Sequence, residues 1–74
     1  MDYYDIGQRI RTLRREKKLS QEQLAEKVWI STTHMSHIEN GSTKLSLPVL
    51  VDLAAALDVS VNELLAGQSS QCLS

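Results

Sequence analysis

Apolar residues recur every three or four positions through most of this 74-residue chain, which is the spacing of one buried helix face. In the first helical segment, residues 5–18, Ile6, Ile10 and Leu13 share one face and arginines occupy the others. No stretch of useful length alternates apolar and polar residues with a period of two, so we expect no β-sheet. The pattern predicts an all-α fold, a compact five-helix domain.

Residues 20–41 predict two short helices joined by a tight turn. The sequence SQEQ at Ser20 is a capping box, Ser31 offers a second N-cap, and Gly41 is a natural left-handed helix stop. Helices over residues 21–28 and 32–40 are too short to persist alone, so they must pack across each other on a third element. That geometry is a helix-turn-helix, whose second helix has the size to enter a DNA major groove. The inward stripes are Leu24, Ala25, Val28, Met35 and Ile38.

The last third of the chain predicts two more helices after a loop over residues 41–45. Ser46 is the N-cap of the fourth helix, Asp58 ends it, and Ser60 caps the fifth. The expected buried positions are Leu47, Leu50, Leu53, Ala54, Leu57, Val61, Leu64 and Leu65. We therefore expect a domain over residues 1–67 and a flexible tail over residues 68–74.

Composition and charge narrow the class of protein. The net charge of −1 argues weakly against binding of nucleic acid. However, seven of the eight cations precede residue 28, so the chain has a basic first half and an acidic end. The single Cys72 excludes an internal disulfide. Without an apolar run of 18 residues or a signal peptide, we expect a cytoplasmic protein with no membrane contact.

Three segments carry a family resemblance: IGQRIRTLRREKKLSQEQLAEKV, then residues 31–41, then LVDLAAALDVSVNELL. Together they cover residues 6–65 and resemble the lambda-repressor-like, Cro-type (XRE) family of bacterial and phage regulators. The resemblance implies a transcriptional repressor that binds double-stranded DNA as a homodimer at a palindromic operator. No ligand-sensing segment is evident, so we expect no small-molecule ligand.

The residues expected to read bases lie at the exposed start of the second helix of the pair. The resemblance places Thr32, Thr33 and His37 at base-reading positions and Gln21 at a residue that contacts the phosphate backbone or the outermost base. Threonine can bond a base edge or cover a thymine methyl, and histidine can bond guanine or a phosphate. Alternatively, these are ordinary solvated side chains. The helix over residues 32–40 carries no Arg or Lys, so bidentate guanine contacts are absent.

Phosphate contacts are expected from cations and small polar residues around the helix pair. For at least half of the cations of the first helix, the alternative is a solvated face. The expected phosphate contacts are Arg9, Arg11, Lys27, Ser31, Ser36, Asn40, Ser42, Thr43 and Lys44.

Two residues are expected to have a structural role. The resemblance matches Arg14 and Glu39 to a buried ion pair that ties the first helix to the third. Trp29 departs from the family, which usually places glycine at this turn position, where positive φ is often required. We interpret the indole as folded over the first helix; the alternative is a hydrophobic contact with a partner.

Apolar residues off the core stripe of the fourth helix predict a dimer interface. Val49, and more specifically Val51, Ala55, Val59 and Val61, could form an exposed patch, although scattered surface valines need no explanation.

No catalytic or metal site is expected. His34 and His37 lack a defined third ligand, Cys72 lies in a polar tail, and no nucleophile with an oriented base is apparent. We therefore expect a non-enzymatic protein without a cofactor. The rival hypothesis is a protein-interaction module, such as an antitoxin-like or antirepressor-binding subunit, built on the same helical bundle.

Overall fold

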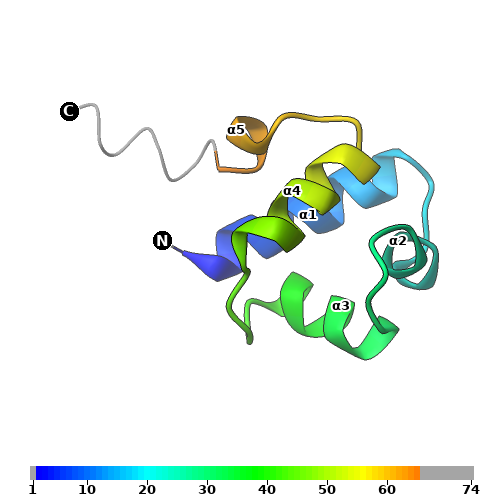
Figure 1. Cartoon of the computed structure of the whole chain (residues 1–74), viewed down its shortest axis with the longest axis horizontal. Coiled ribbons are helices and arrows are strands. Elements are labelled where there is room, and N and C mark those ends of the chain that lie inside the picture. Colours follow the sequence, from blue (N-terminus) through cyan, green and yellow to red (C-terminus); the bar gives the residue numbers. More distant parts are fainter. Residues whose placement is uncertain (1, 66–74) are drawn as a thin grey trace.

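The computed structural model describes residues 2–65, and this part of the chain contains five α-helices and no strand (Figure 1). The predicted all-α, five-helix fold is confirmed. The boundary expected at residue 67 and the tail over residues 68–74, with Cys72, lie outside the described residues. The helices are α1 Tyr3–Glu16, α2 Gln21–Lys27, α3 Thr32–Asn40, α4 Leu47–Ala56 and α5 Val61–Leu64.

Side-chain caps fix where the helices begin. Ser20 forms the predicted capping box with Gln23, and the hydroxyls of Ser31 and Ser60 accept the backbone N–H groups of residues 34 and 63. Ser46 occupies the N-cap position of α4, but its hydroxyl makes no capping bond. Helix α1 begins at residue 3 rather than at the predicted residue 5. The earlier start is stabilised by the carboxylate of Asp2, which accepts the backbone N–H groups of Tyr4 and Asp5.

Four helices end in the same left-handed turn. The first or second residue after the helix has positive φ, at 60° for Lys18, 61° for Trp29, 74° for Gly41 and 60° for Asp58. In each turn the following N–H donates back to a carbonyl five residues earlier, as Ile30 N does to Ala25 O at 3.0 Å. These turns end α1 at residue 16 and α2 at residue 27, slightly earlier than periodicity predicts, because apolar spacing does not reveal the turn.

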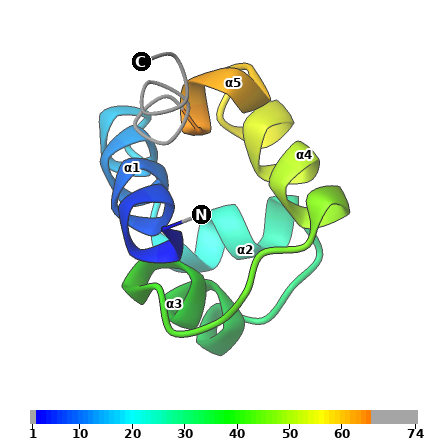
Figure 2. The ribbon, with the colours of Figure 1, turned by 90° about the vertical axis from the view of Figure 1, so that its left-hand side faces the viewer.

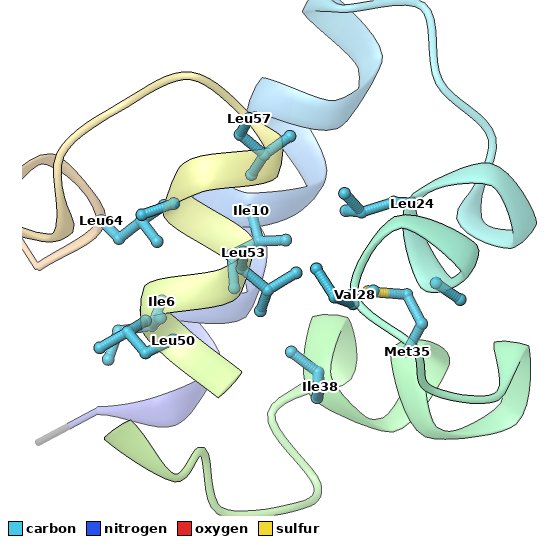
Figure 3. Packing of buried hydrophobic residues seen from close by; sticks show 12 residues of the cluster. Ile6, Ile10, Leu24, Val28, Met35, Ile38, Leu50, Leu53, Leu57 and Leu64 are labelled. Atoms are coloured by element: carbon cyan, nitrogen blue, oxygen red, sulfur yellow. The ribbon is translucent and has the colours of Figure 1, made fainter. Parts of the chain in front are cut away.

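The core lies where the inner faces of all five helices meet (Figure 3). Its largest members come from every helix, for example Ile10 of α1, Leu24 of α2, Met35 of α3, Leu53 of α4 and Leu64 of α5, all at most 1% exposed. The predicted stripe therefore holds in each helix.

Leu47 is the exception, since its side chain is 66% exposed rather than buried. It occupies the first position of α4, and burial along this helix begins only one turn later, at Leu50. The spacing places Leu47 on the core face, but the first turn of the helix extends beyond the packed interior. Val61 and Leu65 are half-buried against the core rather than enclosed by it.

The C-terminal end of α3 lies directly against the first turns of α1 (Figure 2). A Cβ at Gly7 would lie 2.3 Å from the carbonyl oxygen of Ile38, and one at Gly41 would lie 2.6 Å from the Cα of Tyr4. Two glycines thus allow the backbones of α1 and α3 to approach closely, which fixes α3 relative to the rest of the bundle.

Candidate nucleic-acid interface

Helix α3 divides into an inner face, which the core holds, and an outer face of short polar side chains. Met35, Ile38 and Glu39 are buried. The predicted base-reading residues Thr32, Thr33 and His37 are exposed, Thr32 as the first residue of the helix and the other two on the side opposite the buried face. Their spacing places Thr33 and His37 one turn apart on the same face. The outer face of α3 is therefore available to a ligand.

The predicted ion pair between Arg14 and Glu39 is present and bidentate. Arg14 Nε donates to Glu39 Oε2 at 2.7 Å and Nη2 donates to Oε1 at 3.1 Å, and Glu39 is only 1% exposed. The third guanidinium nitrogen, Nη1, donates to the carbonyl oxygen of Leu19 at 2.8 Å, in the turn before α2. A single arginine therefore connects α1, the approach to α2 and α3.

Glu39 also receives two amide groups. Gln21 Nε2 donates to Glu39 Oε1 at 3.1 Å, and Gln8 Nε2 donates to the backbone carbonyl of Glu39, also at 3.1 Å. Within residues 2–65 no buried side-chain nitrogen or oxygen lacks a hydrogen-bond partner. The network is fully satisfied, which is the condition under which a buried charge pair can hold a helix in one orientation.

The contact with Glu39 restricts what Gln21 can offer to a ligand. A carboxylate only accepts hydrogen bonds, so the amide nitrogen of Gln21 must face Glu39. Gln21 can then present its carbonyl oxygen and its second N–H outward. Gln21, a predicted DNA contact at the start of α2, is therefore also part of the anchor that holds α3.

His37 is paired with Ser42 in the turn that ends α3. Ser42 Oγ donates to the carbonyl oxygen of His37 at 3.3 Å, and Nδ1 of the His37 ring lies 3.4 Å from the same Oγ. Both contacts form together only when Nδ1 carries a proton, and Nε2 of a neutral ring is then an acceptor. Ser42, which is a predicted phosphate contact, thus holds the ring of His37 in one orientation.

The predicted phosphate contacts do not all lie on one face. Arg9 borders a groove that Leu64 of α5 also lines, whereas Arg11, two residues further along α1, points about 200° away around the helix. Lys27 borders a hollow that Asp52 of α4 also lines. Arg9 and Lys27 are therefore displaced from the outer face of α3.

The other predicted phosphate contacts belong to α3, its flanking residues or the neighbouring side of α1. Ser31 is the N-cap of α3, Ser36 is half-buried within the helix, and Asn40 is exposed at its end. Thr43 and Lys44 follow in the loop, where Lys44 is exposed.

The interpretation of Trp29 as a ring folded over α1 was wrong. Its side chain is 92% exposed, and its φ of 61° preserves the left-handed conformation that glycine usually supplies in this turn. The turn geometry is stabilised by its two backbone hydrogen bonds and by the half-buried Ile30, which packs against the core. The indole therefore contributes no core packing.

The predicted dimer residues separate into two groups. Val51 is 46% exposed and Ala55 is exposed, both on α4. Val59 and Val61 are half-buried, as is Val49, and all three pack against the core. Only the α4 pair is available as a surface patch.

Gly7 and Gln8 were not identified from the sequence, although both fix the position of α3. A glycine inside a helical pattern was the available signal for a close backbone approach. Among the described residues, no helix is long and apolar enough to cross a membrane. Residues 2–65 also contain no group of three or more His, Cys, Asp or Glu side chains that could hold a metal ion.

Comparison with known proteins finds helix-turn-helix proteins as relatives of this chain. The family model described as helix-turn-helix matches residues 10–64. The transcriptional regulator SinR of Bacillus subtilis is 46% identical over 61 residues, which cover 81% of this chain and 55% of SinR. The chain spans about half the length of the curated relatives it matches.

Solved structures share both fold and sequence with this chain. The restriction-modification controller protein C.AhdI from Aeromonas hydrophila superimposes with a TM-score of 0.82 at 40% identity, over 85% of this chain and 96% of its own. SinR, a master regulator for biofilm formation, in complex with DNA, gives a TM-score of 0.75 at 46% identity, over 81% and 97% of the two chains.

Proposed function

Because this chain belongs to the helix-turn-helix family, we propose that it binds double-stranded DNA with α3 in the major groove and acts as a transcriptional repressor. The observation that carries the proposal is the division of α3. Its inner face is locked to α1 through Glu39, while its outer face presents Thr32, Thr33 and His37. The DNA complex of SinR, at 46% identity, supports the same use of this fold.

The contacts available on α3 favour a particular kind of base readout. Thr33 can donate, accept or cover a thymine methyl, and Nε2 of a neutral His37 accepts from the exocyclic amino group of adenine or cytosine. Because α3 carries no Arg or Lys, we infer that DNA shape and thymine methyls contribute much of the specificity. Phosphate contacts come from Arg11, Asn40 and Lys44 rather than from the displaced Arg9 and Lys27.

Two copies related by a two-fold axis read twice as many bases as one copy does, so we propose a homodimer on a palindromic site. Its role is binding rather than catalysis, and we place its action in the cytoplasm, on the bacterial or phage DNA of the nucleoid. One observation favours the alternative function of a protein-interaction module: the exposed indole of Trp29.

The test is enrichment of a random duplex DNA pool on the purified protein at physiological salt, followed by affinity measurements on the recovered site. Thr33→Ala and His37→Ala should each weaken binding by about 1–3 kcal/mol, roughly 5- to 150-fold, without changing the unfolding midpoint. Thr12→Ala is the matched control, because Thr12 lies on α1 in the groove beside α5.

The enriched site also tests the dimer. A two-fold-symmetric motif is expected, with the half-site spacing reporting the separation of the two α3 helices. If only salt-sensitive binding without an enriched motif survives, or if Thr33→Ala and His37→Ala bind as tightly as Thr12→Ala, α3 is not a base-reading helix and the interaction module is favoured.

A further inference from the structure

The turn that ends α3 fixes the position of Ser42 relative to His37. The backbone N–H of Ser42 donates to the carbonyl oxygen of His37 at 3.0 Å. Gly41 precedes Ser42 with a φ of 74°, and a Cβ there would lie 2.6 Å from the Cα of Tyr4, so the turn is packed against α1. The side chains of Ser42 and His37 are both exposed, but the backbone between them is held in one conformation.

Only one placement of protons satisfies both contacts of the Ser42 hydroxyl. Its Oγ lies 3.3 Å from the carbonyl oxygen of His37 and 3.4 Å from Nδ1 of the ring. A carbonyl oxygen only accepts, so the single hydroxyl proton must point to it, and Oγ then accepts from a protonated Nδ1. If the hydroxyl donated to Nδ1 instead, the contact with the carbonyl oxygen would be lost. The Nδ1–H tautomer therefore keeps two hydrogen bonds and the alternative keeps one.

The electrostatic potential at the end of α3 favours the same tautomer. His37 lies in the last turn of the helix, where carbonyl groups without a helical partner concentrate partial negative charge. An N–H directed towards these carbonyls is attracted to them, whereas the lone pair of an unprotonated Nδ1 is repelled. A neutral imidazole in water prefers the other tautomer, with its proton on Nε2. The hydroxyl and the helix end therefore both act against the ordinary preference of the ring.

The tautomer decides what the free edge of the His37 ring can recognise. Nδ1 is occupied by Ser42, so Nε2 is the nitrogen left for a base. An unprotonated Nε2 accepts and matches the exocyclic amino groups of adenine and cytosine, whereas a protonated Nε2 donates and matches the keto oxygens of guanine and thymine. Adenine and guanine carry these opposite groups on the same ring position, as do cytosine and thymine. The location of one proton therefore separates two amino bases from two keto bases.

We propose that Ser42 is a positioning residue that holds His37 in the Nδ1–H tautomer, so that α3 selects an amino base over a keto base at the base pair facing His37. Ser42 has this role only if the proposed function holds, because it acts through His37 and the recognition helix. The ring can accommodate a keto base by changing its tautomer, at the cost of about one hydrogen bond. The preference for the amino base should therefore be about 3- to 10-fold.

The tautomer can be measured in the free protein, without DNA. Nitrogen NMR shifts of the imidazole, recorded at about pH 8 where the ring is neutral, show which nitrogen carries the proton. His34, the other of the two histidines, is the internal reference, because its ring makes no hydrogen bond within residues 2–65. We expect mainly Nδ1–H for His37 and mainly Nε2–H for His34.

Variants of Ser42 show whether its hydroxyl is the cause. Ser42→Ala should return His37 to the Nε2–H tautomer, whereas Ser42→Thr keeps a hydroxyl and should retain Nδ1–H. Thr43→Ala, which removes the neighbouring hydroxyl of the same loop, is the matched control and should leave the His37 shifts unchanged. An Nε2–H ring in the unmodified protein, or a tautomer that Ser42→Ala does not change, would overturn the proposal.

Base substitution tests the consequence on DNA. In an enriched site, the base pair that His37 reads is the one whose substitution no longer changes the affinity of His37→Ala. At that position the unmodified protein should bind adenine about 3- to 10-fold more tightly than guanine, or cytosine more tightly than thymine by the same factor. Ser42→Ala should remove or invert this preference, and Ser42→Thr should restore it.

The same measurements distinguish this role of Ser42 from a phosphate contact and from failure of the proposed function. Loss of a phosphate contact weakens binding to every base by the same factor. An equal loss for all bases in Ser42→Ala, or a keto preference of the unmodified protein, would overturn the proposal and leave DNA recognition by α3 standing. If no site is enriched, or if His37→Ala binds every site like the unmodified protein, the proposed function fails as well, whichever tautomer the NMR spectra show.

Discussion

The backbone makes the same left-handed turn shortly before α3 and directly after it, but the surroundings of the two turns are opposite. At the C-terminal end Gly41 has a φ of 74°, and a Cβ there would lie 2.6 Å from the Cα of Tyr4. Before the N-terminal end, Trp29 has a φ of 61° with its side chain 92% in solvent. One turn demands glycine for both conformation and space, while the other accepts the largest side chain at a cost in conformation alone.

This difference shows how α3 can be rigid and still present a free surface. Its C-terminal half is fixed by two glycine contacts, by the Arg14–Glu39 pair and by the amides of Gln8 and Gln21. The proposed base-reading residues lie mostly toward the other half, where the helix is held by its Ser31 cap and by Met35. Most of the anchor is therefore separated from the surface proposed to contact DNA, and Gln21 is the residue that belongs to both.

The largest expected effect comes from removing one half of the buried ion pair at the anchored end. Glu39→Ala should lower the free energy of unfolding by about 3–5 kcal/mol, because the Arg14 guanidinium would stay buried without its partner. Chemical denaturation measures the loss, and Glu26→Ala, an exposed acid on α2, is the matched control with a change within about 0.5 kcal/mol. Equal stability of the two variants would mean that the pair does not hold α3.

A second prediction concerns Gly41, the glycine in the turn at the C-terminal end of α3. Gly41→Ala should cost about 2–4 kcal/mol, since alanine adds both the left-handed strain and a clash with the backbone of Tyr4. Gly7→Ala separates the two causes, because Gly7 is inside α1 and has no positive φ, while the nearest atoms to its Cβ would be backbone carbonyl atoms of Ile38 and Glu39 in α3. If Gly41→Ala costs less than about 1 kcal/mol by thermal or chemical unfolding, the close approach of α1 and α3 is not required.

The smallest effect has the opposite sign. Trp29→Gly should raise the free energy of unfolding by about 1 kcal/mol, because it removes left-handed strain and no buried contact. Trp29→Ala keeps that strain, so its stability should stay close to that of the unmodified chain. A loss of stability in Trp29→Gly would show that the indole packs on the domain.

Local chemistry was sufficient to predict most of the elements. Serine caps, apolar spacing and the Asn–Gly stop located α3 at residues 32–40, as the structure has it, and indicated which of its faces is buried. These signals act within one or two helical turns, so they can be read from the chain directly. The same holds for the capping box at Ser20 and for most of the core, including Leu24, Leu53 and Leu64.

Features that depend on contacts between distant segments were harder to predict. The roles of Gly7 and Gln8 follow from how closely α1 approaches the end of α3, a distance that local spacing does not contain. The burial of Leu47 was mispredicted because its register matches the core face while the core ends one turn later. Arg9 and Lys27 carry the charge expected of phosphate contacts, but the packing of α5 and α4 determines which surface they occupy.

The sequence by itself therefore determined the helices, their caps and the polar face of α3, because these depend on side chains within a few residues of one another. Only the tertiary structure decided that Gln21 and Ser42 are engaged by Glu39 and His37, and that Trp29 stands in solvent beside Lys27 and Asp52. Hydrogen-bond partners and exposure are set by how the helices pack, since a side chain's neighbours in space come mainly from other elements. Composition and spacing specify what each residue can do, and packing specifies which of those options remain open.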